Sequence, residues 1–115
     1  MVGRPRRGEV YWADLEPVVG SEQGGRRPVL VVQNEFGNIH ARTTIIVPLT
    51  TRRPTRPYPF IVHVQHPALG PSSWAHAGQI RTIDKARLLP GPIAMLETDV
   101  MARIDEALRV SLGMY

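Results

Sequence analysis

The sequence contains no cysteine, a single lysine and no long apolar run. Without cysteine, neither a disulfide framework nor a thiolate-bound zinc ion can form. The segment formed by the first seven residues is basic because it contains three arginines, but no apolar stretch follows it. We therefore expect neither a signal peptide nor a membrane span. These absences predict a cytoplasmic protein that has no membrane partner.

The common catalytic signatures are also missing. There is no P-loop, no GxGxxG and no HExxH pattern. His63 and His66 have a spacing that occurs in metal sites, but no carboxylate or cysteine lies near them in the sequence. Two histidines could act as acid and base on RNA, yet nothing in the sequence brings any two together. We therefore predict neither a metal nor a cofactor.

The size and composition favour one small β-rich domain. A chain of 115 residues suits a single domain, 1–115, and 43% hydrophobic residues allow a real but small core. Such a core often gains from oligomerisation. Ten glycines and eleven prolines indicate many turns and short strands rather than a helical bundle.

The positive charge is concentrated in the first half of the chain. The net charge is +4, and it arises before Pro67, where nine arginines face five acidic residues. The sequence pI is about 10.3. Arginine favours polyanions because its planar guanidinium matches phosphate and stacks on bases. The charge pattern therefore points to nucleic acid or to an acidic protein as the partner.

Hydrophobic patterning predicts five short strands and one helix. β-Branched and alternating apolar residues mark the strands, and apolar residues at helical spacing mark the helix, with Thr98 as its N-cap and Gly113 as its stop. Pro48 predicts an edge or a bulge, because proline cannot donate to a ladder. Segment 66–76 reads as a long connection. The expected strands are 9–15, 28–33, 43–50, 60–64 and 78–83, and the helix is 99–112. Together they indicate a small barrel packed by a helix.

Arg27 and Thr50 are the strongest candidates for chemistry. Arg27 enters a strand directly after a glycine-rich loop, so the rigid backbone of the strand could hold its guanidinium toward a phosphate. Thr50 ends a strand, where its hydroxyl could donate to a phosphate oxygen. By itself Thr50 is better explained by ordinary β-propensity, and only the resemblance described next favours the functional interpretation.

Four separate blocks, in order, resemble the MazF/PemK family of toxin endoribonucleases. The opening Arg-Gly-Glu-Val at 7–10 is similar to the family's Arg-Gly-Asp start, with glutamate in place of the usual aspartate. The stretch 17–34, PVVGSEQGGRRPVLVVQN, is similar to its P-x-x-G-S-E…R-P core. Segments 46–50, IVPLT, and 79–88, QIRTIDKARL, match later strands, and the helix also fits. Segment 51–76 fits poorly, so the RNA sequence preference is the property least safely transferred.

The resemblance implies a dimeric SH3-like β-barrel of the MazF/CcdB type with a C-terminal amphipathic helix. It implies a sequence-specific toxin that cuts single-stranded messenger RNA without a metal, inhibits translation and growth, and is neutralised by an antitoxin, which the basic charge suggests is acidic. The family's catalytic arginine and threonine fall on Arg27 and Thr50. The resemblance also suggests an acid/base role for Arg27, but a guanidinium keeps its proton at neutral pH, which favours an electrostatic role. Glu22 could be the base or could orient Arg27.

Further residues are expected to bind RNA. The loop 21–25 offers backbone N–H groups and small side chains to an unstacked base. Trp74 could stack on a base, whereas packing in the core or at the dimer face is expected of Tyr11 and Trp12. The expected RNA-binding residues are Ser21, Gln23, Gly24, Gly25, Arg26, Asn34, Arg52, Arg53, Arg56 and Gln79.

Two other classes of protein stay open at this point. A gyrase-poisoning toxin on the same fold is not an enzyme and would not need Glu22, Arg27 and Thr50. A plain SH3-like module would bind nucleic acid without cutting it.

Overall fold

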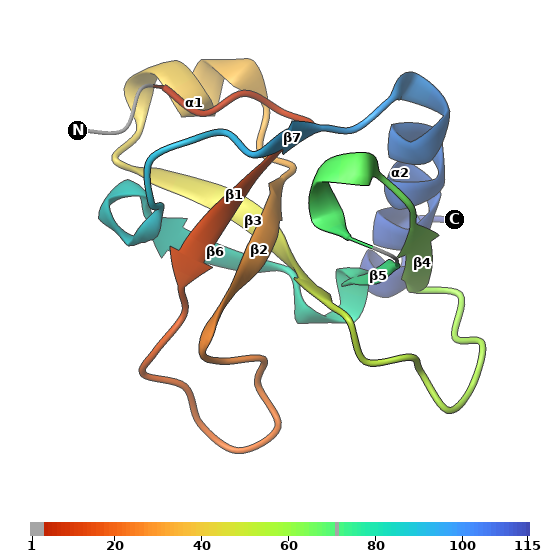
Figure 1. Ribbon diagram of the computed structural model, residues 1–115. Helices are drawn as coiled ribbons and strands as arrows, with labels where there is room; N and C mark the ends of the chain where they lie inside the picture. Colours follow the sequence, from red (N-terminus) through yellow and green to blue (C-terminus); the bar gives the residue numbers. More distant parts are fainter. Residues whose placement is uncertain (1–3, 71) are drawn as a thin grey trace.

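A single curled antiparallel sheet with one long helix against it forms the protein (Figure 1). The computed structural model describes residues 4–70 and 72–115, so the start of the basic amino-terminal segment lies outside the described residues. The strands are β1 (Glu9–Asp14), β2 (Arg26–Val31), β3 (Thr43–Thr50), β4 (Ile61–Val64), β5 (Ser73–His76), β6 (Arg81–Asp84) and β7 (Ala94–Met95). The helices are α1 (Glu35–His40) and α2 (Thr98–Leu112), with single 3-10 turns η1 (Pro67–Leu69), η2 (Ala77–Gln79) and η3 (Lys85–Arg87). The predicted barrel-like sheet with a C-terminal helix is confirmed.

Strand β3 is the centre of the sheet. It pairs with β2 along one edge, while β6 and then β5 share its other edge. Pro48 lies between the residues that pair with β6 and those that pair with β5, and the register turns its nitrogen away from β2. The prediction of an edge or bulge at Pro48 was wrong. The proline lies in a central strand, at a gap where a missing N–H removes no ladder bond.

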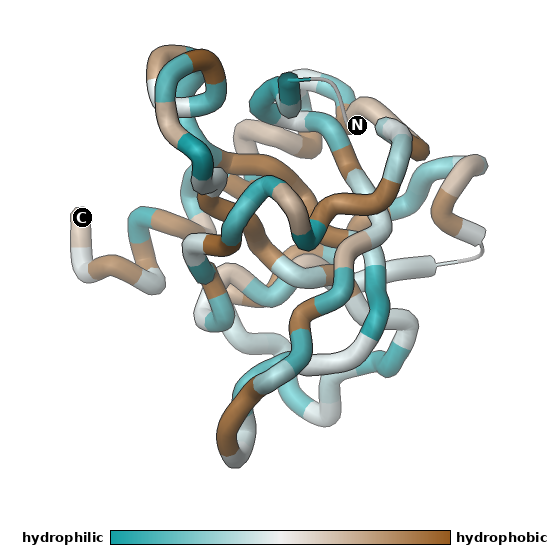
Figure 2. Tube along the Cα trace, turned by 90° about the vertical axis from the view of Figure 1, so that its left-hand side faces the viewer, coloured by the Kyte–Doolittle hydropathy of each residue, from teal (hydrophilic) through white to brown (hydrophobic). Residues whose placement is uncertain are grey.

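Two apolar clusters lie on opposite faces of the sheet. Alternate residues of β1 and β2 belong to different clusters, as the two-residue period of a strand requires. The first cluster packs under α2 through Ile104 and Ala107, and the second is enclosed where a bridge joins Ala13 to Leu88. Figure 2 shows apolar stretches crossing the middle of the fold, while hydrophilic and apolar residues are mixed along its outer loops. Tyr11 is in the second cluster, 1% exposed, which confirms core packing for that ring.

Several element boundaries differ from the predictions. Helix α2 begins at Thr98, so Glu97 rather than Thr98 is the N-cap, and it makes no side-chain cap bond. Gly113 ends the helix with φ 70°, as predicted. The strand predicted at 28–33 is shifted to Arg26–Val31, and the one at 78–83 is shortened to Arg81–Asp84. Segment 66–76 is not only a connection, because its end forms β5. Both α1 and β7 were missed.

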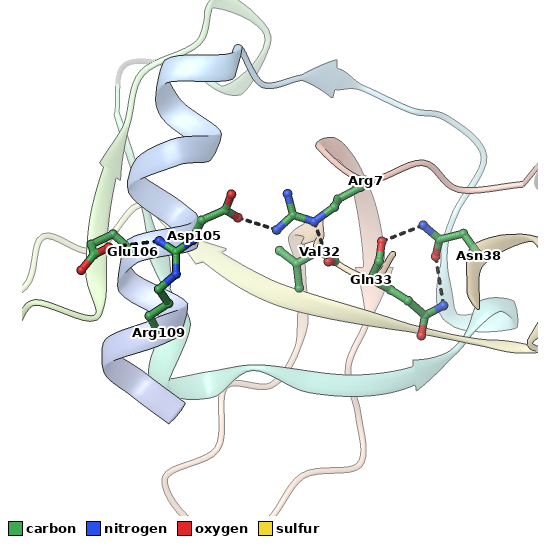
Figure 3. A network of polar contacts seen from close by, with 7 residues as sticks. All are labelled: Arg7, Val32, Gln33, Asn38, Asp105, Glu106 and Arg109. Carbon is green, nitrogen blue, oxygen red and sulfur yellow. Dashed lines mark hydrogen bonds and ion pairs between the residues drawn. The ribbon is translucent and has the colours of Figure 1, made fainter. Parts of the chain in front are cut away.

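A polar network joins the amino-terminal segment to both helices (Figure 3). The Arg7 guanidinium donates to the Val32 carbonyl at 2.9 Å and pairs with Asp105 of α2. Buried Asn38 exchanges hydrogen bonds with Gln33, at 3.0 and 3.1 Å. This network fixes the far end of β2 and so makes the strand a rigid base for the residues at its start.

Candidate functional site

Arg27 and Thr50 lie side by side where β2 begins and β3 ends. The register sets Val29 opposite Pro48, and continuing it by two residues brings Arg27 opposite Thr50. Both side chains are half-buried, and both line the same two cavities. The two residues predicted to carry chemistry therefore lie together at the walls of these cavities.

The Arg27 guanidinium is oriented by two backbone carbonyls. Its Nε donates to the Gly24 carbonyl at 2.7 Å, and its Nη1 donates to the Leu49 carbonyl at 3.4 Å. A guanidinium carries five N–H donors, so three remain available for a ligand. Two of them are enough for a bidentate contact with a phosphate.

The Thr50 hydroxyl is also oriented and still able to donate. Its Oγ1 accepts a hydrogen bond from the Arg52 backbone N–H at 3.1 Å. Because a hydroxyl has one proton besides its lone pairs, the Thr50 O–H stays free to donate to an oxygen placed beside Arg27.

Two cavities flank the Arg27–Thr50 pair. The first, of about 430 Å³, is mainly apolar and is bordered by Trp12, Pro28, Leu49, Leu69 and Ile93, with Arg26 at its wall. The second, of about 360 Å³, is bordered by basic and aromatic side chains, namely Arg52, Arg53, Tyr58, Trp74 and His76, and by Gln23. A chain with a phosphate at Arg27 would have room for a neighbouring group on each side.

The loop between β1 and β2 is held against η2 by one side chain. Gln79 accepts from the Gln23 backbone N–H at 3.1 Å and donates to the Ser21 carbonyl at 3.4 Å. Three of the residues predicted to bind RNA, Gln79, Ser21 and Gln23, therefore lie together at this loop. Gly24 supplies the carbonyl that orients Arg27, and Gly25 has φ 75°. A glycine is needed at that turn because other residues rarely adopt this conformation.

Glu22 does not join the Arg27–Thr50 pair. Its carboxylate accepts from the Val19 backbone N–H within the same loop, at 2.5 Å. It borders a separate cavity with Gln79 and Arg81 rather than either cavity at Arg27. This position favours a role in shaping the loop over a role as a base.

Asn34 lies outside the site. It caps α1, where its Oδ1 accepts from the Gly37 backbone N–H at 2.8 Å, beyond the opposite end of β2 from Arg27. The arginines of segment 51–60 also differ in position. Arg52 and Arg53 border the second cavity, whereas exposed Arg56 does not. Figure 1 shows this segment and the loop between β1 and β2 extending from the same edge of the sheet.

Aromatic residues around the second cavity were largely missed. Tyr58 and His76 were not predicted, whereas Trp74 was. Burial lowers the pKa of His76, whose buried Nδ1 has no hydrogen-bond partner. The only signal in the sequence was the aromatic content of segments 58–60 and 74–76. Because 66–76 was interpreted as a connection, this signal was not used.

The described residues contain neither a metal-ligand cluster nor a helix that could span a membrane. Within residues 4–70 and 72–115, no three histidine, aspartate or glutamate side chains gather closely enough to hold a metal ion. His63 instead contacts Ser72 at 3.0 Å, and His66 accepts from the Ala68 N–H at 3.1 Å. None of the helices in these same residues is long and apolar enough to cross a membrane.

Known proteins resemble the chain over nearly its whole length. A family model described as "PemK-like, MazF-like toxin of type II toxin-antitoxin system" matches residues 6–112. Endoribonuclease EndoA of Bacillus subtilis (strain 168) is 45% identical over 111 residues, 95% of each chain. MazF (Form-I) from Deinococcus radiodurans superposes with a TM-score of 0.84 at 32% identity, over 97% of this chain and 99% of that one. An endoribonuclease in complex with its cognate antitoxin from mycobacterial species gives 0.80 at 30%, over 96% and 97%. The matched region includes both strands that carry the Arg27–Thr50 pair.

Proposed function

Because the chain belongs to the family of PemK-like, MazF-like toxins and is an endoribonuclease, we propose that Arg27 and Thr50 carry out its RNA cleavage. The observation that supports this most is the oriented Arg27 guanidinium, which keeps three donors free beside a free Thr50 hydroxyl. The substrate is single-stranded RNA, whose neighbouring groups enter the two flanking cavities. If that RNA is messenger RNA, the toxin acts in the cytoplasm and stops translation and growth.

The proposed chemistry uses a nucleophile supplied by the RNA. The 2′-oxygen forms a bond to phosphorus and loses its proton to water, while the bond from phosphorus to the 5′-oxygen breaks and that oxygen takes up a proton. Negative charge builds on the phosphoryl oxygens. Arg27 pairs with that charge, and Thr50 donates to one of the oxygens. The products are a 2′,3′-cyclic phosphate and a 5′-hydroxyl.

Partners follow from the same family. We infer that a cognate antitoxin with an acidic segment neutralises this toxin, as the mycobacterial relative is in complex with its antitoxin. We also infer that the chain works as a homodimer, since exposed apolar side chains such as Trp12, Phe36 and Met95 are 44%, 75% and 53% accessible. Sedimentation of the pure protein would test the dimer.

The experiment that tests the nuclease is incubation of pure protein with long RNA in EDTA. We expect defined fragments ending in a cyclic phosphate. A substrate with deoxyribose just 5′ of the cut should resist, because it lacks the nucleophile. Efficient cutting of that substrate would refute the mechanism. Blocked DNA supercoiling without RNA cleavage would instead identify a gyrase poison, and binding alone would identify a non-catalytic module.

A further inference from the structure

Aromatic rings gather around the second cavity, and the proposed cleavage step does not use them. The β-sheet register sets Thr50 opposite Trp74 and sets Trp74 opposite His63, so these three residues form one row across β3, β5 and β4. Side chains directly opposite one another on neighbouring strands lie on the same face. Trp74 is therefore the immediate cross-strand neighbour of a residue in the proposed catalytic pair.

The Trp74 ring is held in place. It stacks on the His63 ring with centroids 4.9 Å apart and planes inclined by 21°. His63 is itself fixed by its contact with the Ser72 hydroxyl at 3.0 Å. With His63 against it, Trp74 presents a preset surface to the cavity that contains Arg27 and Thr50.

A second series of stacked rings borders the same cavity. Tyr58 stacks on Phe60 at 5.0 Å with planes 14° apart, and Phe60 stacks on His76 at 5.4 Å. Tyr58 is 42% exposed, so the ring at one end of the series is open to a ligand. Burial lowers the pKa of His76, which favours its neutral ring over the charged form.

The charges at this cavity complete the picture. Arg52 and Arg53 border it together with Arg27, and no acidic side chain of the described residues lines it. Flat aromatic faces beside guanidinium groups are the combination that binds single-stranded nucleic acid, since the rings stack on bases and the arginines pair with phosphates. An acidic peptide would use the arginines but would leave the flat rings without a matching partner.

We propose that the cavity between Trp74, Tyr58 and the Arg52–Arg53 pair is a nucleobase subsite. A base adjacent to the cut phosphate stacks on Trp74, and Tyr58 forms the second wall. This inference rests on the proposed ribonuclease activity and adds to it the residues that hold a neighbouring nucleotide. Trp74 and Tyr58 are binding residues and take no part in the bond-breaking step.

The test compares variants on a short RNA that contains one mapped cleavage site. The variants are Trp74→Ala, Trp74→Phe and Tyr58→Ala. Tyr115→Ala is the matched control, because Tyr115 is a 93% exposed ring at the end of the chain and does not line the cavity. Trp74→Ala should raise KM roughly tenfold with little change in kcat, as expected for the loss of one base-stacking contact. Trp74→Phe should restore most of the affinity.

Abasic nucleotides identify the contact directly. One nucleotide at a time on either side of the cut is replaced by its abasic form, and each substrate is assayed with wild type and Trp74→Ala. At one position the two losses should not add, because the variant and the abasic substrate remove the same contact. Fully additive losses at every position would overturn the subsite. Should Trp74→Ala fail to fold, the same cycle with exposed Tyr58→Ala decides the question.

The two proposals fail in different ways. If wild-type protein cuts no RNA, the proposed function fails before the subsite is tested. If wild type cuts RNA normally while KM is unchanged in both ring variants, only the subsite fails. A third outcome would assign the cavity to a protein partner instead. In that case Trp74→Ala would weaken the binding of an acidic peptide and leave RNA binding unaffected.

Discussion

The Arg27 guanidinium is held by the Gly24 and Leu49 carbonyls and makes no ion pair with another described residue. Arg27→Ala should therefore lose on the order of 100-fold or more in cleavage rate, as when one preorganised donor is removed, with little change in stability. Arg27→Lys should recover little, because an ammonium cannot reproduce the fork of donors. Single-turnover rates and thermal melts check both statements. Wild-type activity in Arg27→Ala would refute the site.

His76 gives a prediction about acid. Its pKa in the folded protein is lower than the ordinary value of 6.5, because burial disfavours the charged ring. The unfolded chain therefore binds a proton more readily, and stability should fall as pH decreases below about 6.5. His76→Phe should lose less melting temperature between pH 7.5 and pH 5.5 than wild type does. Equal losses, or an equal benefit from replacing exposed His40, would contradict this account.

Single residues differ in how far their roles could be predicted from the sequence. Arg27 and Thr50 stood at ends of recognisable strands and within family motifs, so their positions followed. The roles of Glu22 and Asn34 depend on nearby backbone N–H groups, those of Val19 and Gly37, which a motif does not specify. His76 could not be interpreted while its strand was missed, because burial and stacking come from partners distant in the sequence.

The loop between β1 and β2 is the element that orients the site. A side-chain carbon on Gly24 would lie 2.2 Å from the Glu16 carboxylate and 2.6 Å from Val18. That carboxylate accepts from the Gly25 backbone N–H, so Gly24→Ala would disturb the turn that holds the Arg27 side chain. We expect Gly24→Ala to lower kcat clearly and to lower the melting temperature only slightly.

Gly20 provides the comparison for that loop. It has φ 58°, so Gly20→Ala is also strained, but nothing lies within 4 Å of the added carbon. Gly20→Ala should cost roughly 1 kcal/mol of stability with little effect on the cleavage rate. If the two variants reduce activity equally, the loop does not orient Arg27 through Gly24. Urea unfolding and single-turnover cleavage separate the two effects.

At the scale of elements, strands with β-branched runs or alternating apolar residues were predictable, whereas β5 and β7, which have neither, were not. Strand β3, TTIIVPLT, matched its predicted bounds because its residues favour a buried strand. β5, SWAH, and β7, AM, lack such a run and exist because β3, β4 and β1 pair with them. The six-residue helix α1 contains Gly37, and its stability comes from the Asn34 cap and the buried Asn38 contacts rather than from propensity.

The whole molecule carries its net positive charge in the half that contains the site, where acidic antitoxin and RNA should compete. Reversing the charge at Arg52, Arg53 and Arg56 should slow antitoxin association more than it changes stability. The association rate of the wild type should also fall as salt rises, because exposed charges are screened beyond about 8 Å at physiological ionic strength.

The check for this competition is a binding titration with and without an uncleavable RNA analogue. Reversal at Arg42, Arg103 and Arg109, three exposed arginines that border neither cavity at Arg27, serves as the matched control for total charge. A ternary complex with unchanged affinities would show that antitoxin binds another face. Equal slowing by both sets of reversals would show that net charge alone, rather than its position, controls association.

The end of β3 separates two tasks along the chain. Thr50 is the last residue of that strand, and the segment after it supplies Arg52, Arg53, Tyr58, Trp74 and His76 to the second cavity but no member of the proposed bond-breaking pair. Exchange of segment 51–76 for that of another toxin of this fold would then leave the Arg27–Thr50 pair in place. It would replace the residues proposed to contact a neighbouring base. Because the two sets of residues are separate along the chain, ribonucleases with new target sequences could be designed by changing that segment alone.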